Sequence, residues 1–148
     1  MIEPEQYKTA SFIVRLGNAV TYYRNGKMQE YGLTSAQGDA IRAILHEPGI
    51  TAAELKRKLG LSQSTVAGLL GRLESKGLVE KLLVDGDARK MSLVPTARGL
   101  ELEAMLRQTA LETQKRIMEG LTESEQAELD RLLGIVLEQM TTVRREKA

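Results

Sequence analysis

The chain of 148 residues contains no cysteine and only one histidine, His46. Without thiols it can form no disulfide, no thiolate zinc site and no cysteine-based redox sensor. One histidine is too few for a histidine-rich transition-metal site, which leaves open only sites built from oxygen ligands. Because the sequence shows no metal-binding motif either, we predict no metal centre.

Long apolar segments are absent as well. The longest apolar runs span only a few residues, whereas crossing a bilayer needs roughly 20. No basic segment followed by an apolar one opens the sequence, as a secretion signal would. We expect a cytoplasmic protein that has no membrane partner.

Enzyme motifs are also missing from the sequence. It has no glycine-rich phosphate loop, no metal motif, and no histidine beside a serine or an acidic pair in a readable arrangement. The sequence predicts no catalytic residue and no cofactor.

Positive charge is concentrated in the middle of the chain, although the net charge is only +1. Residues 51–100 hold nine basic and five acidic side chains, which gives +4, while residues 1–50 are neutral and residues 101–148 carry −3. A local positive field attracts polyanions such as nucleic acids. Charge also fluctuates by a few units over any such length, so this signal needs support from motifs.

Hydroxyl residues mark the predicted helix starts. Thr34, Thr51 and Thr122 are each followed three positions later by glutamine or glutamate, the spacing of a capping box. With Ser62 and Thr96 as further caps and glycines as stops, the pattern predicts helices over 5–31, 35–46, 52–59, 63–76, 97–119 and 123–146. Two strands, 79–84 and 90–94, form a hairpin. The expected fold is a single chain, mainly α with a small β-hairpin.

The helices at 52–59 and 63–76 form a predicted helix-turn-helix. Apolar residues of the two helices are expected to pack together, Ala53, Leu55 and Leu59 against Val66, Leu69, Leu70 and Leu73. Small or polar residues then face outward from the second helix: Gln63, Ser64, Thr65, Gly68 and Arg72. A helix in the major groove contacts base edges chiefly through its N-terminal turns. Free N–H groups beside Ser62 can also hold a phosphate, although hydroxyl residues at a helix start often serve only as caps.

Gly68 and Gly71 lie inside this second helix, where glycine costs about 1 kcal/mol relative to alanine. One explanation is close approach of the helix backbone to DNA at Gly68. The other is tight packing against a neighbouring helix, and the sequence does not separate the two.

The hairpin carries basic residues directly after the helix-turn-helix. Its predicted turn is Asp85-Gly86-Asp87, and Arg89 and Lys90 begin the returning strand. An arginine at such a tip can enter the minor groove, and Asp87 can hold it in position. The alternative is a solvated turn with a weak surface ion pair.

Apolar stripes run along the first and last helices. Their members recur at three- and four-residue spacing, namely Phe12, Leu16, Ala19, Val20 and Tyr23 in one and Leu129, Leu132, Leu133, Val136, Leu137 and Met140 in the other. These faces fit either an intramolecular bundle or a homodimer. We favour the homodimer, because a two-fold protein can occupy two half-sites one helical turn apart.

Four motifs follow one another along the chain: Ser62-Gln63-Ser64-Thr65-Val66, Leu70-Gly71-Arg72-Leu73-Glu74-Ser75-Lys76-Gly77-Leu78-Val79, Asp87-Ala88-Arg89 and Thr96-Ala97-Arg98-Gly99. In their order and separation they resemble the motifs of the MarR family of winged helix-turn-helix transcriptional regulators. The resemblance covers essentially the whole chain. Two positions depart from it: Pro95 stands where leucine is more common, and Gly71 replaces a residue that is commonly polar or charged.

The resemblance implies a homodimeric repressor that binds a pseudo-palindromic operator in double-stranded DNA and leaves it on binding a small, often aromatic, ligand. It implies a winged-helix lobe over 34–95, with dimerisation helices in 1–33 and 96–148. The expected DNA-binding residues are Ser62, Gln63, Ser64, Thr65, Gly68, Arg72, Lys76, Asp87, Arg89 and Lys90.

The family's ligand pocket lies between the dimerisation helices and the lobe. Polar or aromatic residues that can line it are Arg15, Tyr22, Tyr23 and His46, although each also fits a structural role. The alternative function is a winged-helix module that binds proteins and responds to no ligand.

Overall fold

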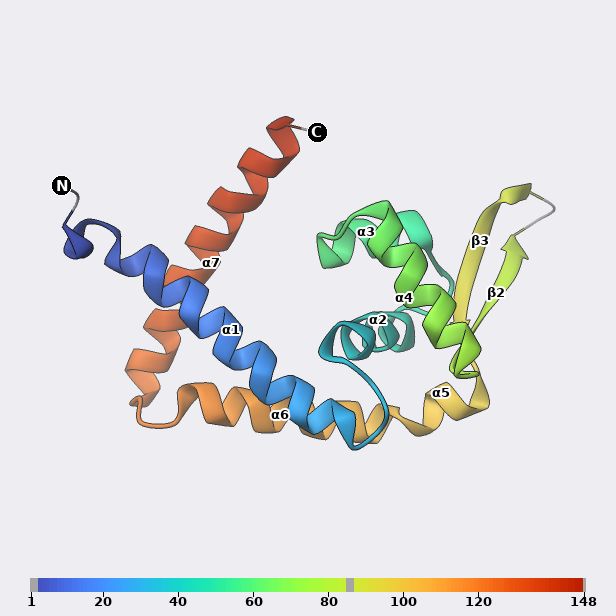
Figure 1. Ribbon diagram of the computed structural model, residues 1–148, viewed down its shortest axis with the longest axis horizontal. Helices are drawn as coiled ribbons and strands as arrows, with labels where there is room; N and C mark the ends of the chain where they lie inside the picture. The colour runs from blue at the N-terminus through green and yellow to red at the C-terminus, as the bar shows by residue number, and fades with distance from the viewer. Residues whose placement is uncertain (1–2, 85–86, 148) are drawn as a thin grey trace. The chain divides into compact units, whose positions relative to one another are not determined.

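The structure is a computed structural model that describes the backbone of residues 3–84 and 87–147, and the side chains of residues 3–83 and 91–142. The chain forms two compact units, Met1–Thr113 and Gln114–Ala148. The described part is mainly helical with one small sheet, as the sequence predicts (Figure 1).

The elements follow one another in a winged-helix order. They are η1 (Pro4–Tyr7), α1 (Lys8–Gln29), α2 (Ser35–His46), β1 (Ile50–Thr51), α3 (Ala52–Leu59), α4 (Gln63–Ser75), β2 (Val79–Val84), β3 (Asp87–Pro95), α5 (Ala97–Glu101), α6 (Glu103–Met118) and α7 (Glu123–Lys147).

The predicted caps start the helices. Thr34 and Gln37 form a reciprocal capping box at α2, whereas at α3 the Thr51 hydroxyl accepts a hydrogen bond from the Glu54 amide. The Ser62 hydroxyl caps α4 by accepting a hydrogen bond from the Thr65 amide at 3.2 Å. These contacts satisfy backbone donors that have no partner inside the helix.

A short turn joins α3 to α4. Gly60 ends α3 with a φ of 66°, in the left-handed region that favours glycine. The turn brings the two helices together, so that Leu55 is fully buried. Ala53, in contrast, is exposed, and its expected packing on α4 is therefore wrong.

The core of the first unit lies between α2, α3, α4 and the sheet. Its largest fully buried side chains come from all of these elements: Ile41, Ile44, Ile50, Leu55, Leu70, Leu73 and Leu93. Burial of this apolar surface supplies the main stabilising contribution to the fold. One face of α4 packs into this core, and the opposite face is exposed to solvent.

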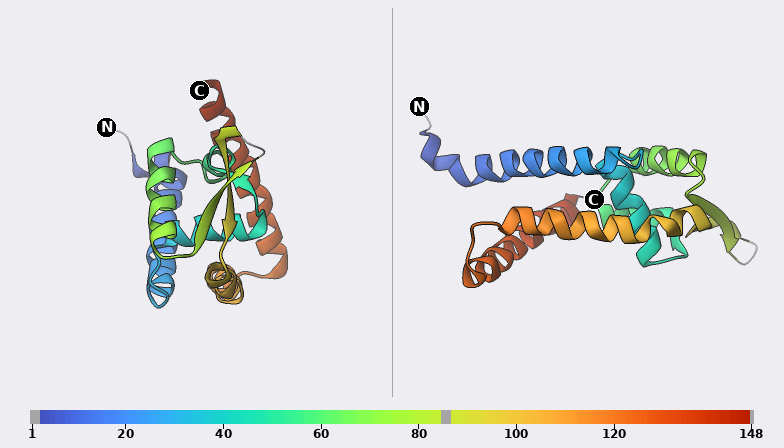
Figure 2. Two further views of the ribbon diagram at one scale, coloured as in Figure 1. Left: turned by 90° about the vertical axis from the view of Figure 1, so that its right-hand side faces the viewer. Right: turned by 90° about the horizontal axis from the view of Figure 1, so that it is seen from below.

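The sheet is antiparallel with the strand order β1-β3-β2. β1 was not predicted, because two residues are too few to show an alternating pattern and its pairing partners, Leu93 and Ser92, are about 40 residues away. β2 and β3 form the predicted hairpin, with β3 longer than expected. The hairpin extends beyond the helices of this unit in Figure 1 and in the right-hand view of Figure 2.

Two predicted helices are interrupted. The segment 97–119 divides into α5 and α6 at Leu102, whose amide makes a tight hydrogen bond to Gly99 O at 3.1 Å. The first helix, predicted from residue 5, is preceded by the 3₁₀ turn η1. Both differences fall at helix ends, where i→i+3 hydrogen bonds commonly replace those of the α-helix.

The second unit consists of the end of α6 and α7. Thr122 and Glu125 form the predicted capping box at the start of α7. Hydrogen bonds from the Thr122 backbone and side chain lower the pKa of Glu125. Most apolar side chains of α7 remain exposed within this chain. No helix in the described part of the chain is long and apolar enough to cross a membrane.

Candidate nucleic-acid interface

The helix α4 is buried on one face and open on the other. Val66, Leu69, Leu70 and Leu73 are buried in the core. The five residues predicted to face outward are all exposed, namely Gln63, Ser64, Thr65, Gly68 and Arg72. The structure therefore brings these predicted contacts together on one solvent-facing surface.

The N-terminus of α4 carries a cluster of hydroxyl groups. Ser62 Oγ lies 2.7 Å from Thr65 Oγ1 and 3.2 Å from Ser64 Oγ. Each hydroxyl can both donate and accept a hydrogen bond. Together with the free N–H groups of the first helical turn, the cluster can contact base edges or a phosphate.

The two glycines of α4 have no internal packing role among the described residues. A Cβ built on Gly68 or Gly71 meets no atom within 4 Å. The packing explanation left open by the sequence is therefore wrong for both. Close approach of DNA to the helix backbone at Gly68 stays a prediction.

Lys76, at the C-terminal cap of α4, has its ammonium group engaged within the protein. Its Nζ donates hydrogen bonds to the Gly32 carbonyl and to Gln37 Oε1, the latter at 2.8 Å. Of the ten predicted DNA-binding residues, it is the one whose described side chain points back to the α1–α2 turn.

The hairpin belongs to the same unit as α4 and is joined to it. Lys81 Nζ on β2 lies 3.0 Å from the Glu74 carboxylate on α4. The strand β3 includes Asp87, Arg89 and Lys90. The structure describes their backbone but not their side chains. Of the predicted turn Asp85-Gly86-Asp87, residues 85 and 86 fall outside the described residues, and Asp87 is the first residue of β3.

A groove of about 640 Å³ opens between α3, α4 and the sheet. Its floor includes Val66 and Leu93, while Lys56, Arg57 and Gln63 contribute polar groups to its lining. Lys56 and Arg57 belong to the positively charged segment 51–100, but their charge alone did not indicate a site. Their position beside Gln63 places positive charge next to the outward face of α4.

Comparison with known proteins identifies the family. Residues 31–90 match the family model described as MarR family. The HTH-type transcriptional repressor Rv2887 of Mycobacterium tuberculosis is 25% identical over 121 residues, which cover 82% of this chain and 87% of that protein. A mutant MarR from E. coli, solved in complex with operator DNA, is 27% identical with a TM-score of 0.83, over 90% of this chain and 96% of that one. Residues 31–90 thus match the MarR family, and the chain resembles solved MarR-type regulators over most of its length.

MarR-family proteins are DNA-binding transcriptional regulators, and this chain shares their winged helix-turn-helix. A further structure, the PcaV transcriptional regulator from Streptomyces coelicolor in complex with its natural ligand, is 25% identical with a TM-score of 0.81. It covers 93% of this chain, which in turn covers 96% of it.

The four predicted ligand-binding residues do not gather at one cavity. Arg15 and His46 are exposed, and Tyr22 is 84% exposed. Tyr23 is partly buried, with Lys27 Nζ 5.8 Å from its ring centroid. None of the four lines the groove beside α4 or the cavity at the α1–α2–α6 junction, as far as the described residues go.

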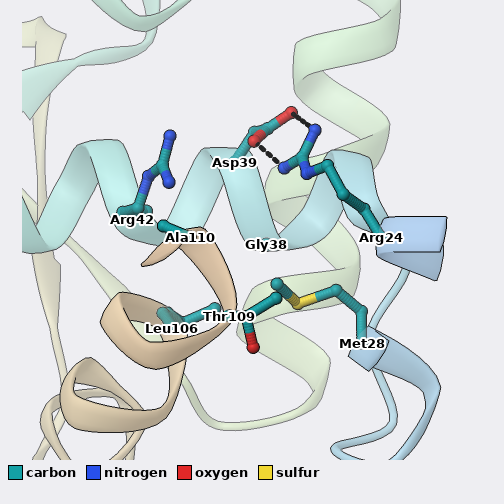
Figure 3. A pocket seen from close by; sticks show the side chains of 8 residues that line it. All are labelled: Arg24, Met28, Gly38, Asp39, Arg42, Leu106, Thr109 and Ala110. Carbon is teal, nitrogen blue, oxygen red and sulfur yellow. Dashed lines mark hydrogen bonds and ion pairs between the residues drawn. The ribbon is translucent and has the colours of Figure 1, made fainter. Parts of the chain in front are cut away.

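The junction of α1, α2 and α6 holds a small cavity of about 10 Å³ (Figure 3). Arg24 on α1 faces Asp39 on α2, and the two terminal guanidinium nitrogens donate to the carboxylate oxygens. Met28 packs against Gly38, where an added Cβ would lie 2.9 Å from the Met28 sulfur. The volume suits about one water molecule. Within the described residues, no cluster of side chains could hold a metal ion.

Proposed function

We propose that this chain represses transcription by binding a pseudo-palindromic operator as a homodimer, and that a small, possibly aromatic, ligand releases it. The observation that carries the proposal is the exposed face of α4, which presents hydroxyl, amide and guanidinium groups while its opposite face is buried in the core. Such a helix fits the major groove of B-DNA, which admits one helix and displays distinct donor and acceptor patterns.

Each part of the lobe then has its own DNA contact. Gln63, Ser64 and Thr65 read base edges, Ser62 holds a phosphate, and Gly68 lets the backbone approach. Arg72 contacts a guanine or a phosphate. The hairpin brings Arg89 to the minor groove, with Asp87 and Lys90 beside it. Lys56 and Arg57 add phosphate attraction next to α4.

Exposed apolar side chains support the homodimer. On α7 they are Leu132, Leu133, Ile135, Val136, Leu137 and Met140, each between 41% and 66% exposed. On α1, Phe12, Ile13, Val14 and Leu16 are also exposed. A stable monomer rarely leaves so many large apolar residues in solvent along one helix. We assign 34–95 to the DNA-binding lobe, and 1–33 with 96–148 to dimerisation.

The proposed response to a ligand is supported by the PcaV regulator, a protein of similar fold whose structure was solved in complex with its natural ligand. Arg15, Tyr22, Tyr23 and His46 stay our candidates for this chain. The cavity at the α1–α2–α6 junction holds about one water, so an aromatic ligand bound there would have to separate these helices.

Fluorescence anisotropy tests DNA binding directly. The purified chain is titrated into a labelled duplex that carries the DNA upstream of its own gene, at several salt concentrations. Binding should weaken steeply with salt, because each phosphate contact releases counterions. Arg89→Ala should weaken binding, and Arg107→Ala on α6 serves as the matched control. Affinity for DNA that is absent, or unchanged by Arg89→Ala, would contradict the corresponding part of the proposal.

The alternative is a winged-helix module that binds another protein. An apolar protein interface should depend little on salt, whereas DNA binding depends on it strongly. The same titration therefore separates the two functions.

A further inference from the structure

Lys76 sits at the far end of α4 from the predicted base contacts. It is the C-terminal cap of the helix, 14 residues after the N-cap Ser62. At 1.5 Å per residue the two caps are about 20 Å apart. Recognition helices contact base edges mainly through their N-terminal turns, so the position of Lys76 does not favour a base contact.

The ammonium group of Lys76 is held by two oxygen acceptors from the start of α2 and the turn before it. These are the Gly32 carbonyl and Gln37 Oε1, the latter at 2.8 Å. Lysine offers three N–H donors, and hydrogen bonds from a charged donor are stronger than neutral ones. To reach a phosphate, Lys76 would have to give up both contacts.

Gln37 is itself held in a fixed orientation. Its side chain is buried, with the residue only 4% exposed. Its Oε1 accepts a hydrogen bond from the Thr34 amide at 3.2 Å as well as the bond from Lys76. Two donors to one oxygen fix the orientation of the amide group. Lys76 therefore contacts a rigid group rather than a mobile surface side chain.

The start of α2 is tied in turn to α1. The Ser35 amide donates to Asn25 Oδ1 at 2.7 Å, and Arg24 pairs with Asp39. Hydrogen bonds thus run from α1 through the start of α2 to Lys76 and the end of α4. Because α1 belongs to the proposed dimerisation region, this network links that region to the proposed DNA-reading helix.

We infer that Lys76 is a positioning residue: its bonds to Gly32 and Gln37 set the orientation of α4 relative to α1, and thereby the separation of the two recognition helices in the homodimer. The inference rests on the proposed binding of a two-half-site operator. It replaces the expected DNA contact of Lys76 with a role in selecting duplexes of one half-site spacing.

The test compares three kinds of duplex. They carry two half-sites at the natural spacing, two half-sites with one base pair inserted or removed, and a single half-site. Lys76→Met keeps most of the side-chain length but removes every donor. Lys58→Met is the matched control, because Lys58 is also a lysine, exposed on α3.

Lys76→Met should reduce the preference for the natural spacing by roughly two- to thirtyfold, the range of typical coupling changes. Affinity for the single half-site and the salt dependence should stay within about twofold of wild type. Lys76→Gln, whose amide can still donate one hydrogen bond, should lie between wild type and Lys76→Met. If Lys76→Met folds poorly, the spacing preference is measured with Lys76→Gln instead. Lys58→Met should leave the spacing preference unchanged.

Three results would overturn the inference. A fall in the salt slope of about one, with equal losses on all duplexes, would make Lys76 a phosphate contact. Equal losses with an unchanged slope and a lower melting temperature would make its role purely structural. Unchanged binding would give it no role. If the wild-type chain binds none of these duplexes, the proposed function fails instead, which is a distinguishable outcome.

Discussion

The backbone of Gly99 lies directly against the carbonyl of Leu78, so that a Cβ on Gly99 would be 2.3 Å from that oxygen. The same carbonyl accepts a hydrogen bond from the Thr96 amide at 3.0 Å, and the Thr96 hydroxyl donates to Gly77 O at 2.6 Å. The start of α5 is thereby fixed to the foot of the hairpin.

Gly99→Ala should therefore destabilise the protein. The added methyl group must displace the Leu78 carbonyl and weaken its hydrogen bond, at a cost of about 1–3 kcal/mol. Urea unfolding of wild type and variant measures the difference. Gly71→Ala is the control, because nothing lies within 4 Å of a Cβ at that position. Equal stability of Gly99→Ala and wild type would show that this contact relaxes freely.

Gly68→Ala should stabilise the fold and weaken DNA binding. The Cβ meets open space, so replacing glycine inside a helix should add up to about 1 kcal/mol. If DNA approaches the helix backbone there, the operator affinity should fall by about fivefold or more. Gly71→Ala should give the same stability gain with a smaller loss of affinity. Undiminished operator binding by Gly68→Ala would argue against close approach.

Arg72→Ala should lower operator affinity by about 1–3 kcal/mol. Arg72 is exposed on the outward face of α4, and none of the ion pairs among the described side chains includes it. If Arg72 contacts a guanine, Arg72→Ala should relax discrimination at one base pair of each half-site. If Arg72 contacts a phosphate, the substitution should lower the affinity for all DNA sequences equally and reduce the slope of the salt dependence by about one. If Arg72→Ala binds the operator with the affinity of the wild type, Arg72 makes neither contact.

Val136→Glu should produce a monomer. Val136 is 41% exposed within the apolar stripe of α7, and a buried unpaired carboxylate in a dimer interface is costly. Light scattering at micromolar concentration reports the mass. Gln139→Glu, at an exposed polar position of the same helix, should remain a dimer. A wild-type chain that is monomeric at this concentration would end the homodimer proposal.

Contacts between residues close together in the chain were predictable from the sequence. Each confirmed cap, at Thr34, Thr51, Ser62, Thr96 and Thr122, is a contact between residues three positions apart. The helix-turn-helix was predictable for the same reason, because its glycine turn and its apolar spacing lie within 25 residues. Such contacts depend on residue type and short-range geometry, which the sequence states directly.

Contacts between distant residues were the part that sequence reasoning missed. β1 exists because Ile50 pairs with Leu93, and neither residue alone indicates that partner. Lys56 and Arg57 were visible as charge, but only the folded lobe places them beside Gln63. Lys76 lies 39 residues after Gln37 in the chain, so its hydrogen bond could not be inferred from spacing.

The amino-acid order alone determined where helices begin and end, which face of α4 is apolar, and which family the motifs resemble. Only tertiary structure decided that Gly68 and Gly71 face open space, and that Lys76 bonds to the turn before α2. The physical reason is the distance along the chain between the residues that interact. Capping and periodicity act over a few residues, whereas packing and long-range hydrogen bonds depend on where the whole backbone has already placed both partners.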